Sequence, residues 1–314
     1  MCDHGVSVMK SNSSVCLIGV IWLCLHISAF GQKNSWDKFI QAGDDALAQN
    51  RSADSEVAYR EAIKLSEKFK ENDPRIAATL IKLAESLNLQ GKRGEAESSA
   101  KSALIALEKT LKASKSKDPA ERFYKLEISV TILDKAGDIL AANQKHGEAE
   151  PLYKTVIALR EGAIRPQEKP KSNEDFLTFM AYAMTHPHVK LADAYYKLAN
   201  FYFNQERFAE AEPFLFKALK ATETEYGANK PTSAVILSKL ATLYAIQKRY
   251  DQAEPLYSRA VSIFEKFDWL DQPEVAVTYD NYSLMLRRMG RETEAATFLE
   301  KAKVVRNRVQ RTTN

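Results

Sequence analysis

Between Lys197 and Lys303 the sequence repeats one pattern three times at a constant step. Each copy contains a short apolar stretch followed by a second stretch that begins with alanine, and the three alanines are Ala211, Ala253 and Ala295. Each of the later two stands 42 residues after the one before it. A constant period of this size is typical of arrays in which similar supersecondary units stack and bury a continuous core.

Small residues follow a related spacing over most of the chain. In six places a small residue is followed twelve positions later by another: Gly43 and Ser55, Ala84 and Ala96, Gly137 and Ala149, Ala199 and Ala211, Ala241 and Ala253, Ser283 and Ala295. Where two helices cross, the side chains at the crossing set the distance between the axes. A bulky side chain there costs about 1–3 kcal/mol of strain. We therefore expect six pairs of antiparallel helices that meet at these residues.

Prolines mark the expected helix starts. Those before first helices are Pro74, Pro187, Pro231 and Pro273, and those expected in the first turn of second helices are Pro151, Pro213 and Pro255. Proline is tolerated in the first turn because the N–H groups there have no partner within the helix. Large apolar residues at helical spacing, such as Leu237, Leu240 and Tyr244, complete the pattern of an all-α fold.

The phrase Ala-Glu-Pro-[Leu/Phe]-[Tyr/Leu]-x-[Lys/Arg]-Ala at Ala211 and Ala253, together with the 42-residue step, resembles the tetratricopeptide repeat family in its kinesin-light-chain-like branch. The resemblance covers about Ser35 to Val305 and is strongest from His188 onward. It implies a right-handed superhelical α-solenoid of about six helix–turn–helix repeats within an array at 32–305. The expected repeats lie at about 35–70, 75–112, 122–165, 188–226, 231–267 and 273–305, with an insertion at 166–186 and a basic tail at 306–314.

Residues 1–31 have the composition of a secretory signal peptide. Lys10 precedes the uncharged run from Val15 to Phe30, and the small residues Ala29 and Gly31 stand before a cleavage point at Gln32. The run is shorter than the roughly 20 residues of a membrane span, although an uncleaved membrane anchor is the alternative. All three cysteines lie in this leader. We therefore expect an exported chain, periplasmic or extracellular, whose mature form has no disulfide.

The sequence contains no motif of a known catalytic site: no Gly-rich phosphate loop, no H-E-x-x-H and no G-x-S-x-G. His186 and His188 flank Pro187 and could offer two imidazoles to a metal ion, whereas a site needs three or four ligands. Other first helices start with Asp-Pro, Lys-Pro or Gln-Pro, so His-Pro is better explained as another helix start. We expect no enzyme activity, no cofactor and no metal. The net charge of +4 is spread along the chain and does not favour nucleic acid binding.

By the same resemblance, first helices line a concave face on which peptides bind. The residues of this chain expected there are Tyr196, Asn200, Asn204, Thr242, Asp280, Arg287 and Arg288, with Asp44, Glu85, Asn88, Asp134 and Asp138 towards the N-terminus. An asparagine side chain can pair with a peptide backbone as donor and acceptor. The alternative is a solvated polar face, and we favour the groove for Asn200 and Asn204. The family's clamp for C-terminal carboxylates is not reproduced.

The end of the insertion is apolar and carries Phe176 and Phe179. We favour packing of these residues on repeats three and four, because exposed apolar patches are uncommon. The alternative is a lid on the groove or an anchor for a partner.

Two functions are compatible with this sequence. The first is a non-catalytic scaffold that binds a protein or peptide partner in the groove. The second is a structural or assembly subunit of an envelope or secretion complex, which acts through its convex face or the insertion.

Overall fold

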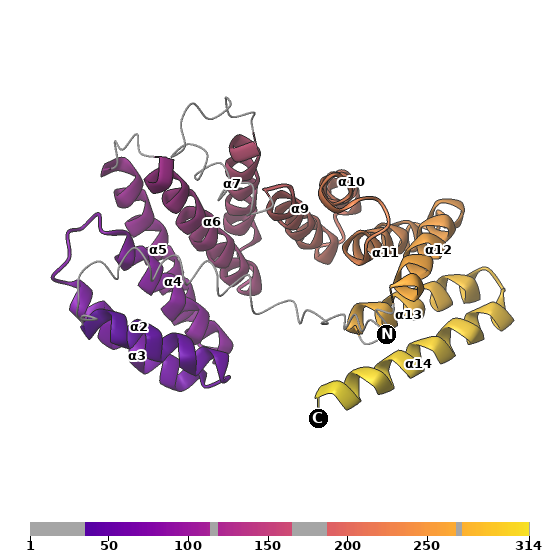
Figure 1. Cartoon of the computed structure of the whole chain (residues 1–314), viewed down its shortest axis with the longest axis horizontal. Coiled ribbons are helices and arrows are strands. Elements are labelled where there is room, and N and C mark those ends of the chain that lie inside the picture. Colours follow the sequence, from indigo (N-terminus) through magenta and orange to yellow (C-terminus); the bar gives the residue numbers. More distant parts are fainter. Residues whose placement is uncertain (1–34, 114–118, 165–186, 268–271, 314) are drawn as a thin grey trace, which may run out of the picture. The chain divides into compact units, whose positions relative to one another are not determined.

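The computed structural model describes residues 35–113, 119–164, 187–267 and 272–313 (Figure 1). All regular secondary structure in these ranges is helical, which confirms the predicted all-α fold. The helices of these ranges, in chain order, are α2 (Ser35–Ala48), α3 (Ser52–Ser66), α4 (Pro74–Leu89), α5 (Arg93–Ala113), α6 (Pro119–Ala142), α7 (His146–Ile164), α9 (Pro187–Asn204), α10 (Phe208–Tyr226), α11 (Pro231–Ile246), α12 (Tyr250–Lys266), α13 (Pro273–Arg288) and α14 (Glu292–Thr313).

The described residues form two compact units, which divide between Thr110 and Leu111: unit 1 lies before this point and unit 2 after it. In unit 1, α3 packs against both α2 and α4. In unit 2, α6 pairs with α7, α9 with α10, α11 with α12, and α13 with α14. The second helix of a pair also packs against the first helix of the next pair, as α7 does on α9, α10 on α11 and α12 on α13. Within each unit, a helix pair thus covers the apolar side of its neighbour, as in an α-solenoid.

The twelve small residues predicted at helix crossings are all buried, from Gly43 to Ala295. The two glycines among them show how tight the crossings are. A Cβ atom on Gly43 would lie 2.3 Å from the Tyr59 ring, and one on Gly137 would lie 2.9 Å from the Tyr153 ring. Both tyrosines come from the second helix of the same pair. A small residue therefore lets a large aromatic ring pack directly on the backbone of the first helix.

Within each pair, the turn between the helices has one conformation in all six described repeats. The residue seven positions after the first small residue has a positive φ: Asn50, Gly91, Gln144, Glu206, Lys248 and Gly290. The next N–H bonds back to a carbonyl five residues earlier, for example Arg249 N–H to Tyr244 O at 2.9 Å. This is the Schellman motif, which satisfies the last carbonyl groups of a helix.

The prolines of first helices lie where the sequence predicts them, since Pro74, Pro187, Pro231 and Pro273 each open a helix. The prediction for second helices is wrong by one turn. Pro151, Pro213 and Pro255 are each the sixth residue of α7, α10 and α12, inside the helix. A proline there leaves the carbonyl of the preceding turn without its usual partner. All three prolines are exposed, so water can bond to that carbonyl.

The C-terminal segment differs from the expected tail. Residues 306–313 continue α14 as helix up to Thr313. Val305 is 2% exposed and anchors this part of the helix, while Arg306 bonds to Asp280 on α13 at 2.5 Å. The basic residues therefore extend the second helix of the last pair.

Candidate functional site

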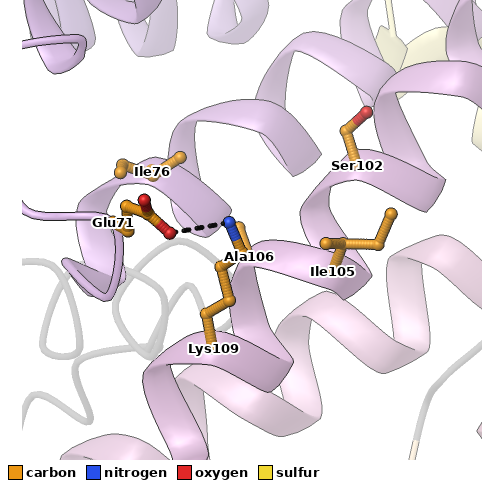
Figure 2. Close-up of a pocket in the computed structure, with 6 residues that line it drawn as sticks. All are labelled: Glu71, Ile76, Ser102, Ile105, Ala106 and Lys109. Atoms are coloured by element: carbon orange, nitrogen blue, oxygen red, sulfur yellow. Dashed lines mark hydrogen bonds and ion pairs between the residues drawn. The ribbon is translucent and has the colours of Figure 1, made fainter. Parts of the chain in front are cut away.

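A pocket in unit 1 is the first place to search for a small-molecule site. Figure 2 shows its lining, which is Glu71, Ile76, Ser102, Ile105, Ala106 and Lys109. Lys109 Nζ bonds to Glu71 across the pocket at 3.0 Å, so its two charged groups already satisfy each other. Ile105 is 60% exposed. This pocket therefore lacks the convergent free polar groups that fix a small ligand.

The glutamates of the Ala-Glu-Pro phrase join one repeat to the next. Glu150 accepts hydrogen bonds from Arg207 at 2.7 Å and Tyr202 at 2.9 Å, both in the following repeat. Glu212 accepts in the same way from Arg249 at 3.2 Å and Tyr244 at 2.7 Å. The phrase is thus explained by packing between repeats.

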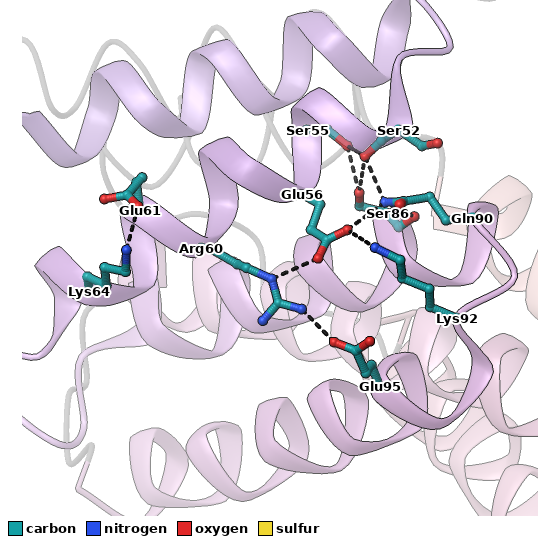
Figure 3. Close-up of polar contacts among 10 residues, drawn as sticks. All are labelled: Ser52, Ser55, Glu56, Arg60, Glu61, Lys64, Ser86, Gln90, Lys92 and Glu95. Carbon is teal, nitrogen blue, oxygen red and sulfur yellow. Dashed lines mark hydrogen bonds and ion pairs between the residues drawn. The ribbon is translucent and has the colours of Figure 1, made fainter.

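Unit 1 contains the same contact in a denser form around Glu56 (Figure 3). Lys92 Nζ lies 2.7 Å from Glu56, Gln90 donates to it at 3.0 Å, and Arg60 donates at 2.8 Å. These donors, Lys92 foremost, lower the pKa of Glu56 to about 2 although burial opposes them. This cluster connects α3 to the turn after α4, and we term it the Glu56 staple.

The first helices of unit 2 lie side by side and form what we term the first-helix face: the sides of α6, α9, α11 and α13 that do not face second helices. Lys197 on α9 bonds to Asp138 on α6 at 2.7 Å. Lys239 on α11 lies 3.9 Å from the centre of the Phe203 ring on α9. Asn281 on α13 donates to Thr242 on α11 at 3.3 Å. The four helices thus present one row of side chains.

Tyrosines of the second helices hold some of the residues that the sequence places on this face. Tyr153 donates to Asp138 at 2.8 Å, and Tyr257 lies 2.9 Å from the Thr242 hydroxyl. Thr242 also donates to the Ser238 carbonyl at 2.8 Å. Burial first, and then the neighbouring Asp138, raise the pKa of Tyr153, so this hydroxyl keeps its proton and remains a donor. Asp138 and Thr242 are therefore engaged in packing between helices.

The other predicted residues of the face differ in exposure. Tyr196 and Asn200 are half-buried, and the Asn200 Oδ1 atom is buried without a hydrogen-bond partner. Asn204 and Arg288 are exposed. Arg287 is exposed and lies 3.8 Å from Glu292, and Asp280 pairs with Arg306. Asn204 and Arg288 thus keep exposed polar groups, whereas the Oδ1 atom of Asn200 is out of reach of solvent. Phe176 and Phe179 lie outside the described residues.

Sequence reasoning missed the apolar residues of this face and Lys239. Leu284 and Val277 on α13 are 49% and 56% exposed, and Ile246 on α11 is 43% exposed. Spacing could have identified Leu284, because it follows the small residue Ser283 as Asn200 follows Ala199. Lys239 stands two residues before Ala241, as Lys197 stands before Ala199.

In the described part of the chain, no group of three or more His, Cys, Asp and Glu residues could hold a metal ion. Within the same ranges, no helix combines the length and the apolar character needed to cross a bilayer.

The tetratricopeptide repeat family matches residues 190–266 and 247–307, which include α9 to α13 almost completely. The matched stretch, residues 190–307, is thus similar to tetratricopeptide repeats. No curated protein sequence matches the chain. The helix pairs before residue 190 share the buried small residues and the turn conformation of the matched repeats.

Solved structures with a similar fold include tetratricopeptide-like arrays. The crystal structure of BtubC (BKLC) from P. vanneervenii has 17% identity and a TM-score of 0.56, over 88% of this chain and 92% of that one. A putative kinesin light chain from Podosopora anserina with TPR-like repeats has 14% identity and a TM-score of 0.56, over 76% and 99%. Pseudomonas aeruginosa pilF has 15% identity and a TM-score of 0.52, over 90% and 99%. At these identities the likeness concerns the fold.

Proposed function

We propose that this chain is an exported, non-catalytic scaffold that binds an extended segment of a partner protein on the first-helix face of unit 2. Rigid helices hold the side chains of such a face in place before binding, so little further ordering is needed. The fold supports this proposal because tetratricopeptide repeat arrays offer long surfaces built from similar units.

The observation that carries the proposal is the exposed apolar surface of α11 and α13. Ser238 pairs with Thr278 at 2.8 Å and Thr242 with Asn281 at 3.3 Å, so the two helices run side by side in a fixed register. From this register we infer that Ile246 lies near Leu284 and Arg288, one turn further along. Exposed leucine and isoleucine beside an exposed arginine suit a partner with apolar and acidic groups.

The test is selection of peptides from a random display library on the purified chain, followed by measurement of Kd. We expect Leu284→Asp and Ile246→Asp each to weaken binding of the selected peptides by about tenfold or more, because an aspartate replaces an apolar contact. The matched control is Val304→Asp, which changes a residue on α14 that is 52% exposed and lies outside the face.

Two results would contradict the proposal. One is a library that yields no binding peptide. The other is an equal loss of affinity in the control variant, since this would place the binding surface away from the first helices.

Export is the second part of the proposal and is supported by the composition of residues 1–31. The chain expressed in its native host should be recovered outside the cytoplasm with an N-terminus at Gln32, determined by mass spectrometry. Recovery of the intact leader in the membrane fraction would instead support the uncleaved anchor.

A further inference from the structure

Polar pairs connect successive first helices at one repeated position. In each pair, the residue just after the small residue of one first helix meets the residue two positions before the small residue of the next. In unit 1 this pair is Asp44 and Lys82, whose charged atoms lie 2.5 Å apart. In unit 2, Asp138 pairs with Lys197 at 2.7 Å, and Thr242 accepts from Asn281 at 3.3 Å. Each lysine of these pairs thus has its own carboxylate.

The step from α9 to α11 breaks this rule. By the same register, Lys239 stands opposite Asn200, which replaces the aspartate of the other two lysine pairs. Among the described residues, no carboxylate lies within ion-pair distance of Lys239, whose Nζ atom lies over the face of the Phe203 ring, 3.9 Å from the ring centre. Asn200 does not supply the acceptor that Lys239 lacks, because the buried Oδ1 atom of Asn200 has no hydrogen-bond partner.

Lys239 therefore holds a positive charge in a poorly solvated place. The side chain is half-buried, and burial alone lowers the pKa of its ammonium group. A partly desolvated charge is unfavourable unless an opposite charge compensates it. The Phe203 ring attracts the ammonium group only through its π face, whereas a carboxylate supplies both charge and strong hydrogen-bond acceptors. A ligand carboxylate would meet both needs of Lys239.

We infer that Lys239 and Phe203 form a subsite for the side-chain carboxylate of an aspartate or glutamate within a bound peptide. The inference rests on the proposed function and adds a preference for acidic residues at one position. An internal side chain suits the place better than a chain end, because α6 lies on one side of the α9–α11 pair and α13 on the other. A peptide that crosses the row continues past Lys239 in both directions.

Calorimetric titration with hexaglutamate, acetylated and amidated at its ends, tests the subsite. At about 0.15 M salt, where distant charges are screened, the wild type should bind hexaglutamate and not the equally blocked hexaglutamine. Lys239→Met should weaken the binding by roughly tenfold or more. The matched control is Lys217→Met on α10, which also removes a lysine placed over aromatic rings, Tyr195 at 5.3 Å and Phe214 at 5.5 Å. The control should bind as the wild type does.

A second variant separates recognition from folding. Asn200→Asp should give Lys239 an internal carboxylate, as Asp138 does for Lys197. We expect a higher Tm together with loss of hexaglutamate binding, a combination that damage to the fold would not produce.

Several outcomes would overturn the subsite: equal binding of hexaglutamine, unchanged binding by Lys239→Met, or binding only of hexaalanine with a free C-terminal carboxylate. If display-selected peptides bind and hexaglutamate does not, this inference fails and the proposed function stands. If no peptide of any composition binds, the proposed function itself fails.

Discussion

Gly137 lies directly beneath the Tyr153 ring, and the hydroxyl of that ring bonds to Asp138 on the same first helix. The same arrangement joins Gly43, Tyr59 and Asp44 in unit 1, where the Tyr59 hydroxyl donates at 2.7 Å. Small size at one position and a hydrogen-bond acceptor at the next are thus two parts of one contact.

Because of this contact, we expect Gly137→Ala to destabilise the protein. An added Cβ would lie 2.9 Å from the Tyr153 ring, so the ring must move away from its acceptor. We expect a loss of about 1–3 kcal/mol in the free energy of unfolding, as for overpacked core sites. Chemical denaturation followed by circular dichroism measures the effect. Gly162→Ala in α7 is the control, because no atom lies within 4 Å of its added Cβ, and it should be neutral or stabilising. Equal effects of the two substitutions would contradict the explanation.

Residue identity at the turns makes a second prediction. Lys248 has φ of 62°, a left-handed conformation that favours glycine, and Gly290 occupies the equivalent position of the last repeat. We expect Lys248→Gly to stabilise the protein by about 1 kcal/mol, since the left-handed conformation costs other residues roughly that much. Gln247→Gly is the control, because φ of −77° there gives glycine no advantage. The urea concentration at the unfolding midpoint, measured for both variants, tests the prediction. A higher midpoint for Gln247→Gly alone would contradict the explanation by backbone conformation.

Single residues also show where sequence reasoning reached its limit. The spacing of Asn200, Asn204 and Arg288 to a small residue predicts that they lie on the first-helix face, and the structure shows that Asn204 and Arg288 are exposed. The engagement of Thr242 could not be foreseen, because its partner Tyr257 has counterparts in only two other repeats, Tyr59 and Tyr153. The isolation of Lys239 becomes visible only when its neighbours are known.

At the scale of helices, the predicted pairs correspond closely to the observed ones because each boundary has a local cause. Pro231 opens α11, and the turn after Ile246 ends it. The interior prolines were misplaced by a turn for an equally local reason. Pro255 does not mark the start of α12, since the helix already begins at Tyr250, five residues before this proline.

The Glu56 staple between α3 and the end of α4 should make the stability of the protein depend on pH in acidic solution. The pKa of Glu56 falls from an ordinary 4.5 to about 2, chiefly because of Lys92. Between these values the unfolded chain binds more protons than the folded chain, so stability is complete above about pH 4.5 and is lost as the pH falls towards 2. We expect Glu56→Gln to flatten this part of the stability profile.

Denaturation at a series of pH values from 2 to 6 tests the role of Glu56. Glu61→Gln is the control, because Glu61 lies on the same helix and its exposed ion pair with Lys64, at 2.6 Å, does not join two repeats. A profile for Glu56→Gln that is parallel to the wild type would show that the staple does not contribute.

At the scale of the whole molecule, each core residue packs only within its own helix pair and against the two neighbouring pairs. α11 is buried on several sides, with Leu237, Leu240 and Ala241 fully inaccessible, since α10, α12 and α13 all pack on it. In an array of this kind, stability is approximately a sum of repeat terms and nearest-neighbour terms. Damage to α11 should therefore spread to adjacent pairs before it reaches distant ones.

Ala241→Leu tests this view of the array. The larger side chain enters the crossing with Ala253, which is completely buried, and should cost about 1–3 kcal/mol. Hydrogen exchange should accelerate first in α11 and α12, then in α10 and α13, and least in α2 and α3. Ala209→Leu, which adds the same side chain at an exposed position of α10, should leave the exchange pattern unchanged. If Ala241→Leu accelerated exchange equally in every helix, the protein would unfold as one cooperative body, and the nearest-neighbour description would be wrong for it.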